Sequence, residues 1–211
     1  MRTLLVSLAA IVLLAACKKS ETINNTVTAV ITVNNLIADT IIGITPIGQP
    51  YGSGKYTLFS IENNTIISNI DSATTKWDIG FRGTNIITNS GNSGPGNGGA
   101  FIQVGAFDDF KTISNDSTFK VDNAPTSYAI TYGSNKGWYV YNGATNLITA
   151  IPGRILVIRT ANNKFAKIEI LNYYKGGVTP ASTASDAVKL SEQRYYTFRY
   201  QYQSNGTKQF Q

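Results

Sequence analysis

The sequence of 211 residues contains no histidine, one methionine and one cysteine. The methionine is the first residue, and the cysteine, Cys17, lies in an apolar N-terminal segment. Without histidine, neither a Ser-His-Asp nor a Cys-His catalytic arrangement can form, and histidine-ligated zinc is excluded as well. A single cysteine also excludes a disulfide within the chain. These absences remove several of the commonest classes of hydrolase and zinc protein.

Charged residues are few, at 14% of the chain, and the formal net charge is +6. The lysines and arginines are scattered rather than gathered in runs, which argues against nucleic acid as a partner. Isoleucine, valine, tyrosine and phenylalanine supply apolar surface for a core, whereas asparagine and glycine favour turns. The composition therefore predicts a folded, all-β protein with one domain.

The N-terminus has the pattern of an export signal. In residues 1–16, Arg2 precedes an apolar run that is typical of a signal peptide and too short to span a membrane comfortably. The residues before Cys17 are small and resemble a bacterial lipobox, which predicts that Cys17 is lipidated. Residues 17–25 are then the lipidated cysteine with a polar tether, and 26–211 form one β domain. The membrane is contacted through the lipid anchor only.

Short bursts of alternating apolar residues predict mostly antiparallel strands with little helix. Lys76–Arg82 places Trp77, Ile79 and Phe81 on one face of a strand. The clearest strand is Arg194–Gln203, and a helical turn is expected at Asp186–Leu190. Further strands are expected at Thr26–Val33, Asp39–Ile44, Tyr56–Ile61, Thr65–Ile70, Asn85–Asn89, Ala100–Val104, Ser117–Val121, Ser127–Tyr132, Gly137–Tyr141, Leu147–Ile151, Arg154–Thr160 and Lys164–Tyr174.

The tail Ser204–Gln211 is expected to fray. Gly91, Gly98 and Gly99 are expected to hold backbone conformations that other residues would strain. The predicted core consists of large apolar residues on the buried faces of the strands, namely Trp77, Phe81, Phe101, Ile155, Val157, Phe165, Ile168 and Phe198.

Motifs with enzymatic meaning are weak in this sequence. Gly94, Gly96 and Gly99 match the GxGxxG motif of dinucleotide-binding proteins, but a predicted strand follows them where the motif requires a helix. The adjacent acids Asp108 and Asp109 lack the further acids of a calcium loop. A glycosidase needs two opposed carboxylates, and the sequence does not point to such a pair. We therefore do not expect an enzyme.

Tyrosine is abundant, and several aromatic residues lie close together in the sequence. Tyr128, Tyr132, Trp138, Tyr139 and Tyr141 fall within fourteen positions. Rings with polar tips suit a pocket for a flat apolar ligand. Ordinary packing within a sheet explains the same cluster, and the residues alone leave both interpretations open.

Two groups of motifs resemble the HmuY family, which are haem-binding lipoproteins of Bacteroidota. The first group comprises Trp77–Arg82, Asn85–Gly91 and the glycine-rich Gly94–Ala100. The second group comprises Gly137–Gly143, Arg154–Arg159, Ala166-Lys167 and Tyr195–Tyr202. Together with the lipobox, the resemblance covers roughly residues 55–203.

The resemblance implies an all-β, HmuY-like fold with an aromatic-lined haem site near one end of the sheet. It also implies capture of haem for a TonB-dependent outer-membrane transporter. Family members hold haem iron with axial histidine or methionine, and the mature chain has neither. Asn142 stands where one axial ligand is expected, and tyrosine is a known alternative ligand. The expected ligand site is therefore Tyr132, Tyr139, Tyr141 and Asn142, with Tyr132 and Tyr141 as candidates for the haem iron.

Three hypotheses follow from this departure. The protein binds haem through tyrosine or through porphyrin packing alone, anchored to the outer membrane or released, on its periplasmic or outer side. Alternatively, it keeps the HmuY fold but binds another flat or apolar ligand, or only a transporter partner. The third hypothesis is an enzyme on the same scaffold, which two carboxylates facing each other across a cleft would favour.

Overall fold

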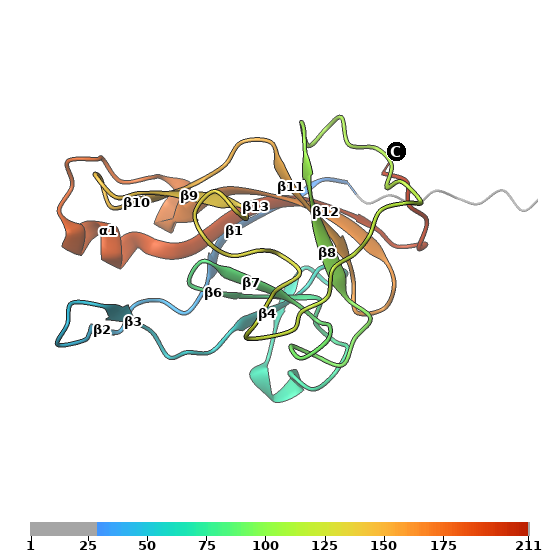
Figure 1. Cartoon of the computed structure of the whole chain (residues 1–211), viewed down its shortest axis with the longest axis horizontal. Helices are drawn as coiled ribbons and strands as arrows, with labels where there is room; N and C mark the ends of the chain where they lie inside the picture. Colours follow the sequence, from blue (N-terminus) through green and yellow to red (C-terminus); the bar gives the residue numbers. More distant parts are fainter. Residues whose placement is uncertain (1–28, 211) are drawn as a thin grey trace, which may run out of the picture.

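Two antiparallel sheets face each other in the structure, a computed structural model that describes residues 29–210 (Figure 1). The larger sheet has five strands, in the order β1 (Ile31–Ile37), β13 (Gln193–Gln203), β12 (Phe165–Tyr174), β11 (Arg154–Arg159) and β8 (Gly99–Val104). The smaller sheet has four, in the order β5 (Thr65–Ile67), β4 (Thr57–Ser60), β6 (Ile79–Arg82) and β7 (Asn85–Thr88). The all-β prediction is confirmed. The predicted signal peptide, Cys17 and the tether lie outside the described residues.

Aromatic side chains from both sheets meet in the core. The ring of Phe198 in β13 lies 5.5 Å from that of Phe81 in β6 and 5.7 Å from that of Phe59 in β4. The alternation predicted for β13 is confirmed, because Tyr196, Phe198, Tyr200 and Tyr202 are all buried. The other predicted core residues are also buried, except Phe101, which is half-buried against Phe119: Trp77, Phe81, Ile155, Val157, Phe165 and Ile168.

The C-terminal segment is packed rather than frayed, so that prediction is wrong as far as residue 210. Phe210 is buried in a second apolar cluster on the other face of the larger sheet. Its backbone N–H donates to Lys111, and Gln209 pairs with Thr112. Lys167 adds a buried amine to this cluster, and its Nζ donates to the carbonyl oxygen of Phe107 at 2.7 Å. The segment from Lys111 therefore holds the tail in place.

Two predicted strands, Ser117–Val121 and Ser127–Tyr132, are wrong. Only isolated bridges form there, at Lys120 and at Ser127. The reason is the buried carboxylate of Asp122, which accepts hydrogen bonds from the backbone N–H groups of Thr88 and Ala129. Because this side chain takes the place of a neighbouring strand, the segment is held as ordered loop rather than as sheet.

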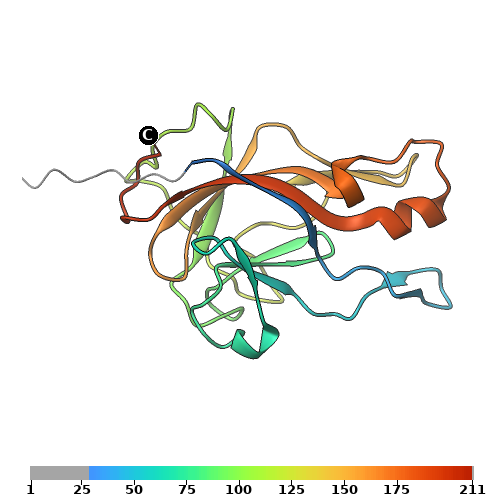
Figure 2. The same ribbon diagram turned by 180° about the vertical axis from the view of Figure 1, so that it is seen from behind.

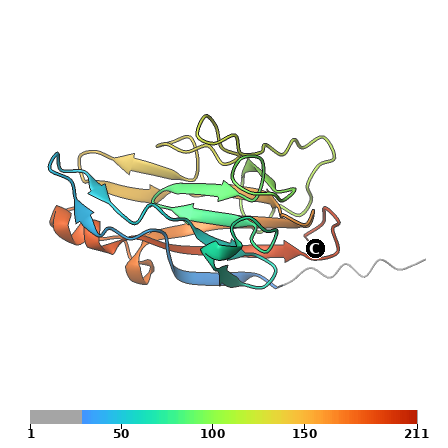
Figure 3. The same ribbon diagram turned by 90° about the horizontal axis from the view of Figure 1, so that it is seen from below.

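Two small hairpins and a short helix gather at one end of the molecule (Figures 1, 2 and 3). The hairpins pair β2 (Gly43–Ile44) with β3 (Pro50–Tyr51), and β9 (Tyr139–Asn142) with β10 (Leu147–Ala150). The helix is α1 (Asp186–Glu192), where a helical turn was predicted, and Ser185 caps its N-terminus. Two short 3-10 helices, η1 (Asn69–Asp71) and η2 (Lys175–Gly177), complete the elements. The C-terminus lies toward the opposite end of the molecule (Figure 1).

Candidate ligand-binding cleft

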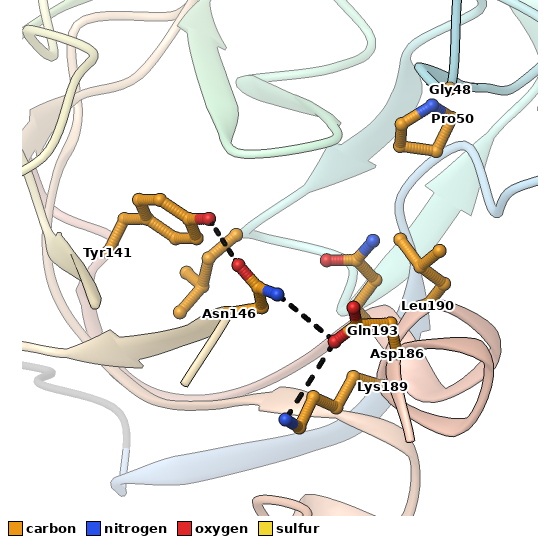
Figure 4. Close-up of a pocket in the computed structure, with 9 residues that line it drawn as sticks. Gly48, Pro50, Tyr141, Asn146, Asp186, Lys189, Leu190 and Gln193 are labelled. Carbon is orange, nitrogen blue, oxygen red and sulfur yellow. Dashed lines mark hydrogen bonds and ion pairs between the residues drawn. The ribbon is translucent and has the colours of Figure 1, made fainter. Parts of the chain in front are cut away.

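A cleft of about 300 Å³ lies between the two hairpins and α1. Its walls come from the β2–β3 hairpin, the β9–β10 hairpin, and α1 with the start of β13 (Figure 4). The lining residues are Gly48, Pro50, Tyr141, Asn146, Ile148, Asp186, Lys189, Leu190 and Gln193. The lining combines aliphatic surface, one aromatic ring and a small number of polar groups, which is the usual composition of a small-molecule site.

A chain of polar contacts links the β9–β10 wall of the cleft to the α1 wall (Figure 4). The hydroxyl of Tyr141 donates to Asn146 Oδ1 at 2.7 Å, and Asn146 Nδ2 donates to Asp186 Oδ1 at 3.1 Å. Because an ionised carboxylate only accepts, Asp186 fixes the orientation of the Asn146 amide. The amide then presents its oxygen to Tyr141. In this arrangement the Tyr141 hydroxyl is the donor.

Lys189 supplies the positive charge of the cleft. Its Nζ lies 3.9 Å from Asp186 Oδ1 and donates to the carbonyl oxygen of Ser182 at 2.9 Å. The side chain is almost fully buried, whereas that of Asp186 is exposed. The ion pair leaves the wall with little net charge, so that a ligand meets donors and acceptors rather than a strong field.

The β9–β10 hairpin is fixed to the body of the protein. The backbone N–H of Ile148 donates to the hydroxyl of Tyr174 in β12 at 2.8 Å, and Trp138 Nε1 donates to the carbonyl oxygen of Thr84 at 2.9 Å. The backbone N–H of Tyr141 donates to Ser134 Oγ at 2.9 Å. This wall is therefore a rigid surface that carries the Tyr141 ring.

The structure places one of the four predicted site residues, Tyr141, in the cleft. Tyr139 lies two residues earlier in the same strand but is packed in the core, with its ring 5.0 Å from Trp138. Asn142 is exposed at the end of β9, where its Oδ1 accepts from the N–H of Ala144 and stabilises the turn. Tyr132 is half-exposed, and its ring packs edge-on against Tyr128. The structure therefore does not bring Tyr132 and Tyr141 to one surface of the cleft.

A smaller cleft of about 170 Å³ contains the carboxylates of Glu62 and Asp78. Both oxygens of Asp78 are engaged, one by the N–H of Ile61 at 2.8 Å and the other by the N–H of Ala161 at 3.0 Å. Burial raises the pKa of Asp78 to about 6, against the lowering effect of these two hydrogen bonds. Because its acceptors are used within the fold, we assign Asp78 a structural role. Within residues 29–210, no cluster of three or more His, Cys, Asp or Glu could hold a metal ion.

Comparison with known proteins identifies the family. The HmuY protein family matches residues 53–184, well over half of the chain. This protein belongs to the HmuY family. The matched segment contains the β9–β10 wall of the cleft, whereas the β2–β3 hairpin and α1 lie outside it. HmuY proteins are binding proteins rather than enzymes.

Two solved structures resemble the HmuY chain described here. A candidate lipoprotein from Bacteroides fragilis matches with a TM-score of 0.48 and 12% identity, over 84% of this chain and 91% of its own. The apo form of the Tannerella forsythia HmuY analog matches with a TM-score of 0.46 and 14% identity, over 84% of this chain and 96% of its own. No curated protein matches the sequence. Within residues 29–210, no helix is long and apolar enough to cross a membrane.

Proposed function

We propose that this HmuY protein is a lipid-anchored haem-binding protein that holds haem in the cleft between its two hairpins. The observation that carries the proposal is Tyr141, which lines a cleft whose apolar lining also includes Ile148, Leu190 and Pro50. A flat porphyrin face suits such aliphatic and aromatic surface. Membership of the HmuY family supports the same ligand.

The residues of the cleft fit a haem group in two respects. Tyr141 is the side chain of the lining that belongs to a known class of haem-iron ligands. The amide of Gln193 is a donor that suits the carboxylates at the edge of the group. Haem iron, when bound, is a Lewis acid that favours the phenolate form of a ligating tyrosine. A phenolate has no hydrogen to donate, so binding iron through Tyr141 would break the hydrogen bond from Tyr141 to Asn146.

A second candidate function is the binding of another flat or apolar ligand without coordination of iron. The contacts from Asp186 through Asn146 to Tyr141 favour it, because they already engage the Tyr141 hydroxyl as a hydrogen-bond donor within the protein. In this case Tyr141 contributes its ring face, and the ligand is held by packing and by hydrogen bonds at its edge. The two candidates share the cleft and differ in the role of a single oxygen atom.

The test compares haemin with iron-free protoporphyrin IX. The chain from Lys18 onward retains all of the described residues and lacks the lipidated cysteine. We expect saturable binding of about one haemin per chain with a shifted Soret band. Tyr141→Phe should weaken haemin binding and abolish a phenolate charge-transfer band, whereas the matched variant Tyr132→Phe, on the loop before β9, should leave both unchanged.

Equal affinity for haemin and protoporphyrin IX, with no effect of Tyr141→Phe, would favour binding without coordination of iron. A non-saturating response to both compounds would contradict a tetrapyrrole ligand altogether. Two measurements thus distinguish the candidates: whether binding depends on the iron, and whether it depends on the Tyr141 hydroxyl.

Lipidation of Cys17 and delivery to a TonB-dependent outer-membrane transporter complete the proposal. Cys17→Ser should release the protein from the membrane fraction of the cells that produce it. A Cys17→Ser variant that stays membrane-bound after carbonate washing would contradict the lipid anchor. The Lys18→Ser variant, which changes the neighbouring residue and retains Cys17, is the control and should stay membrane-bound.

A further inference from the structure

The β2–β3 hairpin exposes large apolar side chains at the edge of the cleft. Ile44 is 56% exposed and Ile47 is 83% exposed, and residues 40–52 contain no charged side chain. Exposed apolar surface that adjoins a pocket usually marks a contact site for a ligand or partner. The exposed isoleucines of the hairpin therefore suit contact with an apolar molecule.

The register of the hairpin places Ile44 on the face that borders the cleft. Ile44 pairs with Pro50, and Gly43 pairs with Tyr51. Side chains of directly opposed residues in an antiparallel pair project from the same face. Pro50 lines the cleft, so the side chain of Ile44 lies on the cleft side of the hairpin. Tyr51 lies on the other face, where its ring covers Gly43.

The tip of the hairpin is ordered and presents Ile47. The backbone N–H of Thr45 donates to the carbonyl of Gln49 at 2.8 Å, and that of Gly48 donates to the carbonyl of Thr45 at 2.9 Å. The N–H of Gln49 adds a bond to Thr45 Oγ1 at 3.0 Å. These bonds close a tight loop with Ile47 at its end, next to Gly48 in the cleft lining.

The base of the hairpin is tied to the wall on the other side of the cleft. The carboxylate of Asp39 accepts from the backbone N–H and the hydroxyl of Ser53 and from the N–H of Gly54. Arg194 Nη1 donates to the carbonyl oxygen of Asp39 at 2.7 Å. Arg194 follows Gln193, which lines the cleft directly after α1. The hairpin is thereby held beside the cleft, although among residues 29–210 its two strands pair only with each other.

We propose that Ile44 and Ile47 form the second apolar wall of the ligand site and contact the face of a flat ligand opposite Tyr141. The ligand class is a rigid, largely apolar ring system with a polar edge, which a tetrapyrrole satisfies; the inference thus rests on the proposed function. The occupant is the ligand rather than a second copy of the chain, because Gly48 and Pro50 of the same hairpin already line the cleft. Ile148 and Leu190 provide matching aliphatic surface there.

The test uses Ile44→Ser and Ile47→Ser in the chain from Lys18 onward, with haemin and protoporphyrin IX as probes. The matched control is Ile70→Ser, because Ile70 is 92% exposed in η1 and lines none of this cleft. We expect each hairpin variant to bind both tetrapyrroles about tenfold more weakly and the control to bind within about twofold of the unaltered chain. Sedimentation velocity should give the same monomeric mass with and without ligand.

A fluorescent label provides a second measurement that does not depend on a loss of binding. The chain from Lys18 has no cysteine, so Ile47→Cys carries a single reactive thiol. Emission from a polarity-sensitive dye at this position should change saturably with haemin, at the same concentration as the Soret shift. A label at Ile70→Cys should not respond.

Three results would overturn the inference, and they are distinguishable. Haemin binding by the unaltered chain, with no effect of either serine variant and no response of the label, would show that the hairpin is not part of the site. A loss of self-association in the serine variants, with unchanged haemin binding, would assign the hairpin to contacts between copies. Absence of saturable binding of either tetrapyrrole by the unaltered chain would contradict the proposed function, and the inference with it.

Discussion

The carboxylate of Asp78 accepts a hydrogen bond from the backbone N–H of Ala161, a residue 83 positions later in the chain. Asp78 immediately precedes β6 of the smaller sheet, whereas Ala161 lies in the turn between β11 and β12 of the larger one. The other oxygen of Asp78 accepts from Ile61, which follows β4. One buried carboxylate thus joins the ends of strands from both sheets.

Asp78 should make the stability of the protein depend on pH between about 4 and 6. Burial raises its pKa to about 6 in the folded state, compared with about 3.9 for an unfolded aspartate. The folded state therefore binds a proton more tightly in this window, and the free energy of unfolding falls as the pH rises through it. Urea unfolding at pH 4.5, 5.5, 6.5 and 7.5 measures the slope, with an expected total change on the order of 2 kcal/mol.

The variant Asp78→Asn separates this contribution from those of other groups. Its slope should be smaller but not zero, because burial also raises the pKa of Asp122. The exposed Asp116→Asn variant is the control and should reproduce the slope of the unaltered chain. An Asp78→Asn slope that matches the unaltered chain would show that Asp78 does not titrate in this range.

Gly91→Ala should destabilise the protein far more than Gly54→Ala. Both glycines have positive φ, +52° for Gly91 and +80° for Gly54, which alanine adopts at a cost of about 1 kcal/mol. A Cβ at Gly91 would in addition collide with the carbonyl oxygen of Asp122, whereas Gly54 has open space. We expect a loss of at least about 3 kcal/mol for Gly91→Ala. Equal losses in thermal or urea unfolding would show that the loop at Gly91 can move.

Phe210→Ala should destabilise the protein by about 3 kcal/mol, although it is the penultimate residue. The ring of Phe210 is buried, 6.1 Å from that of Phe110 and 5.5 Å from the amine of Lys167. Lys208→Ala is the control, since the Lys208 amine donates to Asn115 Oδ1 in an exposed contact at 3.3 Å. Urea unfolding that gives the two variants equal stability would mean that the tail does not contribute to the core.

The sequence predicts the sheets well where apolar and polar residues alternate within a single strand. Alternation identifies β13 and the buried faces of β6 and β12, because a half-buried strand needs apolar residues at every second position. It fails for Ser117–Val121 and Ser127–Tyr132, where the Asp122 side chain accepts backbone hydrogen bonds that a neighbouring strand would otherwise accept. It also fails at the tail, since the burial of Phe210 depends on residues about a hundred positions away. Such long-range contacts leave no local signal.

The candidate site is only partly predictable for a related reason. Period two places Tyr139 and Tyr141 on one face of β9, but it does not show where the core ends along that strand. The structure buries Tyr139 and leaves Tyr141 in the cleft. Asn146 and Asp186, which orient the Tyr141 hydroxyl, come from different elements and match no motif. The sequence predicts a strand at Asp39–Ile44, whereas only Gly43–Ile44 forms one, and Ile44 is exposed beside the cleft.

Removal of the Asp186 carboxylate should strengthen haemin binding selectively. In the unaltered chain, Asp186 holds the Asn146 amide with its oxygen toward Tyr141, which keeps the phenol as a donor. In Asp186→Ala the amide is free to turn and donate to Tyr141, which stabilises the phenolate that iron prefers. We expect haemin to bind up to about tenfold more tightly, while the affinity for iron-free protoporphyrin IX stays unchanged. Asp116→Ala, an exposed aspartate outside the cleft, is the control. If Asp186→Ala changes the affinity for both compounds equally, the Tyr141 oxygen does not coordinate iron, and the ring of Tyr141 acts as a packing surface alone.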